Sequence, residues 1–269
     1  MGSNGKFRSY KTKKDFLNRI LPADVKAHNH RDSVLEAFIA KGDRRISKSV
    51  LPPFMRLRLR FSKKGIVKFI SRLEQIEVFR GAARRSGLPI AFTAGFSPQV
   101  KSSYGPPLPI GQESISEYME LYFTQKIDIE EVKKEFERVL PEGYKILDAK
   151  RVPLNFPAID ILSNIAEYEI KNIEISQLEI DKLLIQDSII IEKIKKGGVI
   201  SIDANPLIRE FTSKNGILKL YLRFASGKTV KPEMILKKLL ENKENYGRMY
   251  KIERTNLYIE TKKGELFLP

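Results

Sequence analysis

The sequence predicts an α+β fold of two tandem ferredoxin-like domains behind a short helical N-terminal extension. After Met55 the chain shows the patterns of a strand, a helix, two strands, a helix and a strand, which is the order of a split β-α-β unit. A similar order recurs after Ala166, and 269 residues suffice for two domains of ordinary size plus an extension. We therefore expect an extension over residues 1–54, one domain over residues 55–153 and a second over residues 154–269.

The first domain begins with alternating apolar and basic residues. Such a period of two predicts a strand with one buried face and one solvent-exposed, cationic face. The residues that alternate are Leu57, Leu59 and Phe61 on the apolar side and Arg56, Arg58 and Arg60 on the other. After a turn at residues 62–65 we expect more extended chain over residues 66–70.

A helix follows, because Ser71 and Glu74 have the spacing of a capping box. It should end near Gly87, with Arg80 and Arg84 on one flank at i and i+4. Glycine- and proline-rich loops at residues 95–98 and 104–111 should then surround a short strand. The pattern continues with a strand at 114–123, a helix at 128–140 and a strand at 144–152.

The second domain follows a connector at residues 153–165. Its elements, read from periodicity and turn residues, are strands at 166–173, 188–194, 199–203, 206–211, 217–224 and 250–259, with helices at 176–185 and 232–240. The sequence Lys214-Asn215-Gly216 is a strong hairpin signal.

Positive charge indicates a polyanionic partner. The chain carries a formal charge of +16, and residues 55–110 hold eleven Lys or Arg against two Glu. Lys and Arg bind phosphates and exposed aromatic rings stack on bases, so we expect RNA binding. A solvated charged face is the alternative. The candidate nucleic-acid-binding residues are Arg56, Arg58, Arg60, Lys63, Lys64, Lys68, Arg72, Arg80, Arg84, Arg85, Phe96, Lys101 and Tyr104.

The sequence favours a protein without a catalytic site, metal or cofactor. It has no cysteine, which excludes disulfides and thiolate-held zinc or iron–sulfur sites. Its two histidines, His28 and His30, have no carboxylates placed to complete a metal site. Ser97 and Asp203 stand in turn sequences. No apolar run is long enough to cross a membrane, so we expect a cytoplasmic protein.

Several motifs carry a family resemblance. They are FSKKGIVKFISRLE at 61–74, RGAARRSGLPIA at 80–91, GFSP at 95–98, LPIG at 108–111 and SEYMEL at 116–121. The chain resembles, over about residues 55–240, the radical-SAM-linked proteins, a bacterial family of unknown function encoded beside or fused to a radical S-adenosylmethionine protein. Arg72 and Gln99 stand where that family usually has His. Residues 20–50 resemble the C-terminal segment of the radical S-adenosylmethionine partner.

These observations predict a non-catalytic accessory protein of a radical S-adenosylmethionine enzyme. The resemblance implies the partner, and the charge implies that the protein binds RNA and presents it for modification. Two alternatives stay open. One is an RNA-acting enzyme of the tandem ferredoxin-like type, similar to pseudouridine synthases or endoribonucleases, and the other is a structural subunit that binds no nucleic acid.

Overall fold

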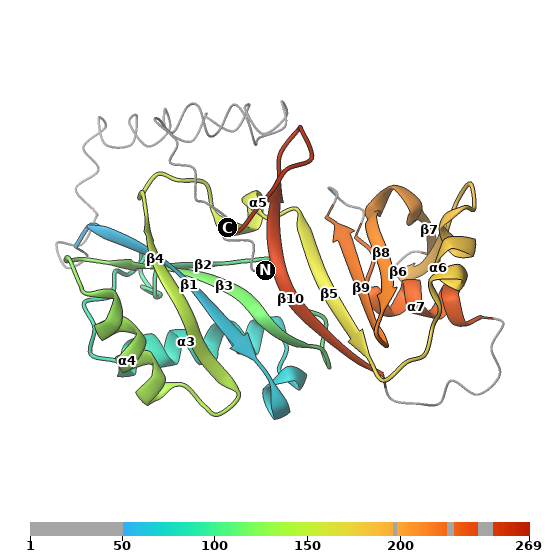
Figure 1. Ribbon diagram of the computed structural model, residues 1–269. Coiled ribbons are helices and arrows are strands. Elements are labelled where there is room, and N and C mark those ends of the chain that lie inside the picture. The colour runs from blue at the N-terminus through green and yellow to red at the C-terminus, as the bar shows by residue number, and fades with distance from the viewer. Residues whose placement is uncertain (1–50, 196–197, 225–228, 242–249) are drawn as a thin grey trace.

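The computed structural model describes residues 51–195, 198–224, 229–241 and 250–269. They form a mixed α+β fold around one nine-stranded sheet, with the order β4-β1-β3-β10-β5-β9-β8, while β2 pairs with β3 and β11 (Leu266–Phe267) pairs with β10. A separate two-stranded sheet joins β6 and β7 (Figure 1). The helix expected within the N-terminal extension and both histidines lie outside the described residues.

The first half of the sheet carries its helices on one face (Figure 1). Its elements are β1 (Met55–Lys63), α3 (Arg72–Arg85), β2 (Ser102–Tyr104), β3 (Glu113–Phe123), α4 (Ile129–Val139) and β4 (Tyr144–Val152). The capping box expected at Ser71 is present, and Asp128 caps α4. Phe61, Phe79 and Phe136 are fully buried in one apolar cluster, so α3 and α4 close the core of this half.

The second half has the sheet order β10-β5-β9-β8. Its elements are β5 (Ile165–Lys171), α6 (Gln177–Leu184), β6 (Ile190–Lys195), β7 (Gly198–Asp203), β8 (Ile208–Lys214), β9 (Ile217–Arg223), α7 (Pro232–Leu240) and β10 (Lys251–Glu260). Ser176 and Glu179 form a second capping box, and Pro232 starts α7. A separate apolar cluster, which includes Ile180 and Leu236, forms the core of this half.

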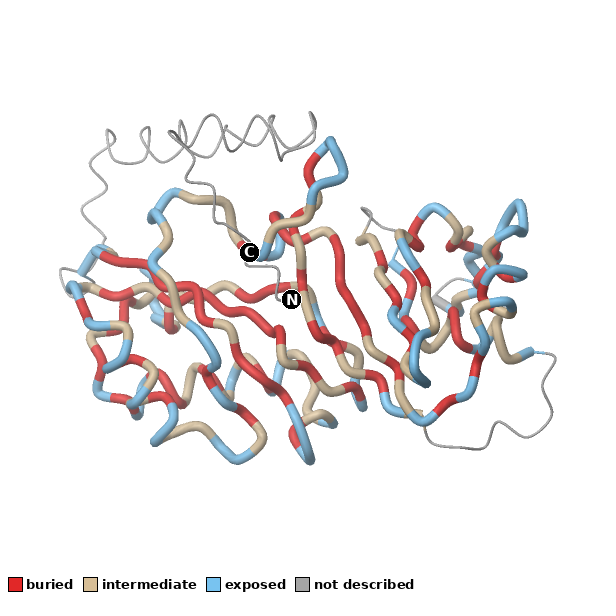
Figure 2. The backbone as a smooth tube through the Cα atoms, viewed as in Figure 1, coloured by how far each residue is buried: buried red, intermediate tan, exposed pale blue. Residues whose placement is uncertain are grey.

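Strands from both halves pair with the same edge of β3. The start of β3 pairs in parallel with β10 at Glu113 and Ser114, whereas Met119 to Leu121 pair with the three residues of β2. Buried residues are concentrated along the central strands (Figure 2). One sheet therefore runs through both halves, and the division into domains at residue 153 stays a prediction.

Three local expectations need correction. Residues expected to be extended near 66–70 form the 3-10 helix η2 (Gly65–Phe69), because Val67 alone of its residues is buried and no second row of apolar contacts holds a strand. The connector contains a short helix, α5 (Ile159–Leu162), and Pro206 lies in the 3-10 turn η3 (Asn205–Leu207). Within the described residues, no helix is long and apolar enough to cross a bilayer.

Candidate functional site

The arginines of β1 do not form an exposed cationic face. Arg56 and Arg58 are only 2% and 3% exposed. Both bind the buried carboxylate of Glu120 on β3, and the Arg58 Nε and Nη2 atoms lie 2.9 and 2.7 Å from Glu120 Oε1. The expectation of a solvent-exposed cationic face at these positions is wrong, because β3 places the carboxylate of Glu120 opposite Arg58 in register.

The Arg56 guanidinium also holds a loop across this face of the sheet. Its Nη1 atom donates to the Phe156 carbonyl at 2.5 Å and to the Leu154 carbonyl at 3.3 Å. Burial lowers the pKa of Arg58 despite the attraction of Glu120. Burial also lowers the pKa of the nearby Lys150 to about 8, and the charge of Arg58 adds to that effect.

Arg60 joins the two halves. Its Nε atom donates to the Ile115 carbonyl at 2.9 Å, and its Nη2 atom lies 3.4 Å from both the Thr255 carbonyl and Asn256 Oδ1 on β10. These contacts bind the Arg60 guanidinium to β3 and β10. None of the three β1 arginines is therefore free to meet a phosphate at the surface.

The candidate cations at the N-terminal end of α3 are also engaged. Lys63 is buried and donates to the Ile70 carbonyl at 2.7 Å. Lys64 pairs with Glu253 at 2.8 Å, and Lys68 pairs with Glu113 at 3.4 Å. Carboxylates of β3 and β10 thus offset much of the positive charge at this end of α3.

Tyr104 does not offer an exposed ring. It is 7% exposed, and its hydroxyl donates to a backbone carbonyl of α3. Arg72 lies with its guanidinium 5.3 Å from the centre of the Tyr104 ring and donates to the Gly105 carbonyl at 2.6 Å. Burial lowers the pKa of Arg72, with partial compensation from Glu117. This aromatic residue is part of the core, so the expectation of base stacking here is wrong.

The C-terminal end of α3 keeps the predicted character. The loop at residues 93–99 is closed by hydrogen bonds between Thr93 and Gln99, and it carries Phe96 fully exposed at its tip. The Arg84 Nη2 atom donates to Gln99 Oε1 at 2.9 Å, and the Lys101 ammonium lies 5.0 Å from the centre of the Tyr122 ring. Of these cations Arg84 is bonded to the Phe96 loop, whereas Arg80 and Arg85 share its helix and Lys101 follows the loop in the chain. We call the Phe96 loop together with these four cations the Phe96 surface.

Arg80 and Arg85 complete that surface with different partners. Arg80 pairs with Glu77 at 2.7 Å, an i,i+3 pair on the exposed flank of α3. Arg85 is exposed and donates to the Val139 carbonyl at 3.2 Å. Exposed pairs of this kind exchange readily with other anions, because each contributes little net stability.

A buried ion pair missed by the sequence analysis lies where β3 meets β10. Arg254 is 0% exposed; its Nε atom lies 3.0 Å from Glu117 Oε1, and its Nη2 atom binds the same carboxylate. The same guanidinium donates to the carbonyls of Pro106 and Pro107 at 3.0 and 3.3 Å. Arg254 therefore fixes the proline-rich loop of the first half from the second half.

This loop forms one wall of a pocket of 440 Å³ between the halves. Arg72 and the loop residues 105–109 line one side, and Tyr168, Phe224 and residues 229–231 line another. Asp160 and Ser163, in and just after α5, complete the lining. The pocket has the size of a small-molecule site. In the sequence, the proline-rich motif was the available signal for this pocket. No sequence pattern pointed to the lining residues from the second half.

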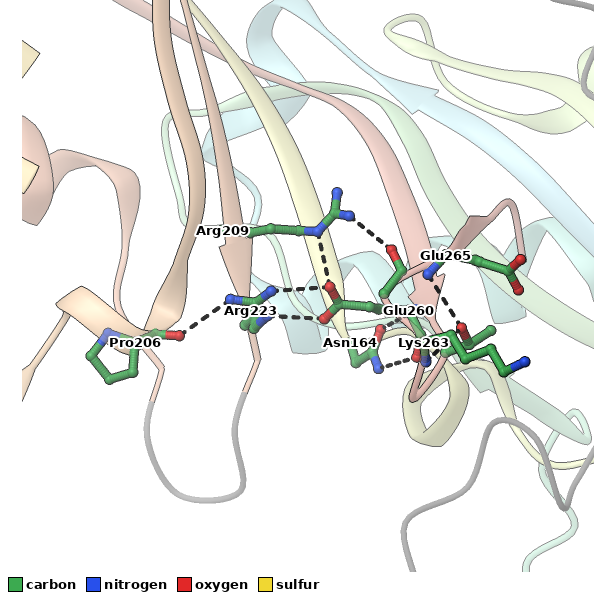
Figure 3. A network of polar contacts seen from close by, with 9 residues as sticks. Asn164, Pro206, Arg209, Arg223, Glu260, Lys263 and Glu265 are labelled. Atoms are coloured by element: carbon green, nitrogen blue, oxygen red, sulfur yellow. Dashed lines mark hydrogen bonds and ion pairs between the residues drawn. The ribbon is translucent and has the colours of Figure 1, made fainter. Parts of the chain in front are cut away.

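A polar network fixes the wall of this pocket next to β9 (Figure 3). The Asn164 carbonyl accepts from the Phe224 amide at 2.7 Å, while the Asn164 side chain bonds both backbone groups of Glu260. The Glu260 carboxylate holds Arg209 and Arg223 at 2.9 Å each. Hydrogen bonds from Arg223 keep the pKa of Glu260 below its ordinary value. We assign this fully paired network a structural role.

The described residues contain no cluster of His, Asp or Glu that could hold a metal ion. Asp203 accepts from the amides of Ile189 and Asn205 at 3.0 Å each, so it is the turn residue that the sequence predicted. Among the described residues, the geometry provides the Phe96 surface and a partly open pocket between the halves.

These features define a mixed α+β protein whose single sheet joins two halves around a pocket. The chain belongs to a family described as uncharacterized protein conserved in bacteria (DUF2344), whose model matches residues 56–232. A search of curated proteins found no match. The expectation of a bacterial family of unknown function is thus confirmed, and the link to a radical S-adenosylmethionine protein stays a prediction. All residues that line the pocket fall within the matched range.

Replacing Glu120 by Gln should lower the free energy of unfolding by about 3–5 kcal/mol, because it leaves two buried guanidinium groups without a countercharge. Urea unfolding measures the change. Glu77→Gln is the matched control, since Glu77 pairs with Arg80 at an exposed site and should cost under about 1 kcal/mol. Equal losses for the two variants would contradict this account of the β1 arginines.

Replacing Lys150 by Met should stabilise the protein at neutral pH by roughly 1 kcal/mol after allowance for solvent screening. The folded-state pKa of Lys150, about 8, lies below its ordinary 10.5, so its burial penalty is fully present below pH 8. As the pH rises toward 10.5, the folded state loses this proton first and the penalty fades. Unfolding of both proteins across this range should show a difference that shrinks with pH; a constant difference would refute the assignment.

Proposed function

We propose that this protein is a non-catalytic, RNA-binding accessory subunit of a radical S-adenosylmethionine enzyme. The observation that carries the RNA-binding part is the Phe96 surface. Phe96 is fully exposed on a loop that internal hydrogen bonds hold, and Arg84 at the end of α3 donates a hydrogen bond to Gln99 of that loop. Single-stranded RNA binds to such surfaces by stacking bases on an aromatic ring while Lys and Arg contact phosphates.

The strand orders support a tandem ferredoxin-like interpretation. The first half has the order β4-β1-β3-β2 and the second has β10-β5-β9-β8, so each places its fourth, first, third and second strands side by side. The β6–β7 hairpin is then an insertion between the first helix and the second strand of the second unit. Proteins with this architecture often bind RNA, although fold alone is only an analogy.

The composition supports a division of labour with an enzyme. A radical S-adenosylmethionine enzyme holds its iron–sulfur cluster with Cys thiolates, and this chain has no cysteine. In this proposal the chain binds the RNA and the partner performs the radical chemistry. Residues 20–50, which resemble a segment of that partner, lie outside the described residues and supply the docking element.

RNA binding should depend on both Phe96 and the cations of the Phe96 surface. With about four phosphates neutralised, the affinity for a short single-stranded RNA should fall roughly fiftyfold between 50 and 200 mM salt. Phe96→Ala should weaken binding by about 1–3 kcal/mol without changing the salt slope, because it removes stacking and no charge. Fluorescence anisotropy measures both.

Two variants make the RNA test specific. The double change Arg84→Gln and Lys101→Gln should reduce the salt slope by about 1.4. Phe69→Ala is the matched control: this exposed Phe lies before the opposite end of α3, about 20 Å along the helix, beside the paired Lys68. Binding that is equally weakened by Phe69→Ala, or that ignores salt, would contradict the proposed surface.

The partner is testable by affinity purification. The tagged full-length chain, recovered from the bacterium that encodes it, should bring down a protein with a three-cysteine cluster motif and its iron–sulfur absorbance. A chain without residues 1–50 should lose that partner and keep its RNA affinity, because the Phe96 surface lies elsewhere. Recovery of no cluster-bearing protein by the full-length chain would refute the accessory role while leaving RNA binding intact.

A further inference from the structure

The pocket between the halves is a separate feature from the Phe96 surface and shares no residue with it. The proline-rich loop lines it on one side, and Phe224 and Val230 line it on another, so much of its wall is apolar. Its volume of 440 Å³ lies within the range of small-molecule sites. The loop is held by the buried guanidinium of Arg254, and the Phe224 side is held by Asn164. The pocket is thus preformed on two fixed walls.

Its charged groups favour an anion. Arg72 and Lys231 line the pocket, against the single carboxylate of Asp160. Arg72 uses one of its five N–H donors on the Gly105 carbonyl. Behind the lining, the carboxylate of Glu117 faces the positive charges of Lys63, Arg72 and Arg254. Glu233 at the start of α7 adds one more negative charge nearby, and its carboxylate offers no hydrogen-bond donor to an anion. The local balance stays positive.

A polar side chain without a partner points to a ligand. Ser163 lines the pocket, is 4% exposed, and its hydroxyl has no hydrogen-bond partner among the described residues. Buried hydroxyl groups in proteins are usually hydrogen-bonded, so an unpartnered one calls for an explanation. A polar ligand atom in the pocket would supply the missing partner.

We propose that this pocket binds a nucleoside monophosphate. Arg72 and Lys231 contact the phosphate, and the base lies between the proline-rich loop and Phe224. Asp160 and Ser163 hydrogen-bond the sugar hydroxyls or the polar edge of the base. A nucleotide has the anion, the flat apolar body and the hydrogen-bond donors that these groups require, whereas inorganic phosphate has no apolar body and a nucleoside has no charge.

The test uses the full-length chain with AMP, GMP, CMP and UMP, each measured by calorimetry and by thermal melting. At least one nucleotide should raise the melting temperature, because a ligand that binds only the folded state stabilises it. The matching nucleoside and inorganic phosphate should each bind at least about tenfold more weakly. Failure of all four nucleotides, or equal binding of the nucleoside, would overturn the proposal.

Variants separate binding from folding. Ser163→Ala should leave the melting temperature of the free protein unchanged or higher, since its hydroxyl has no partner among the described residues, yet weaken nucleotide binding about fivefold. Lys231→Gln changes an exposed residue and should weaken binding about tenfold without unfolding the chain. Arg84→Gln, at the Phe96 surface, is the matched control and should bind nucleotide normally. Wild-type affinity in both pocket variants would overturn the proposal.

A competition arm identifies the source of the nucleotide. Short RNAs that carry a 5′- or 3′-terminal phosphate should displace the bound nucleotide if the pocket accepts the end of an RNA chain. If they do not compete, the ligand is a free nucleotide. The competition is measured in the Phe96→Ala variant as well as in the wild-type protein, so its result does not depend on the Phe96 surface.

Discussion

The desolvation of arginine is the constraint around which this structure is arranged. A guanidinium taken out of water is costly unless a carboxylate and carbonyls replace its hydration. Glu120 meets this need for Arg56 and Arg58 on one side of β3, and Glu117 meets it for Arg254 on the other. Because one strand carries both carboxylates, β3 binds β1 and β10 by charge as well as by backbone pairing. Buried charges therefore specify the junction of the two halves together with the short β3–β10 pairing.

The division of the β3 edge explains where the pocket lies. β10 occupies the first residues of that edge and β2 a later stretch, so the chain after β2 must leave the sheet beside β10. The proline-rich loop makes that departure, since proline cannot continue a strand ladder. Arg254 binds the carbonyls that this loop exposes. The proline-rich motif is visible in the sequence, but it forms a pocket wall because Arg254, far along the chain, binds its carbonyls.

Local signals predicted most elements of the fold, including the capping box at Ser71, the Pro232 start of α7 and the hairpin at residues 214–216. They failed where the partner of a residue is distant. Alternation in β1 correctly indicated a strand, but whether Arg58 faces water depends on Glu120, which lies 62 residues away. Glu117 and Glu120, beside and within the otherwise apolar run at residues 118–123, were the available signal, since buried carboxylates need buried cations. Pairing across strands, and hence the pocket, cannot be read from periodicity alone.

The same reasoning limits what net charge says about function. The surplus of Lys and Arg over residues 55–110 is divided among three environments. Some of these side chains are buried in the sheet, and some lie at the N-terminal end of α3, where carboxylates offset their charge. The others lie at the C-terminal end of α3, where their charge stays exposed. Exposed cations release counterions when they meet a phosphate, so of these three groups only the last is accessible to a polyanion. The buried arginines contribute indirectly. They hold the sheet, and through Arg254 the proline-rich loop, in the geometry that leaves one surface and one pocket open for partners.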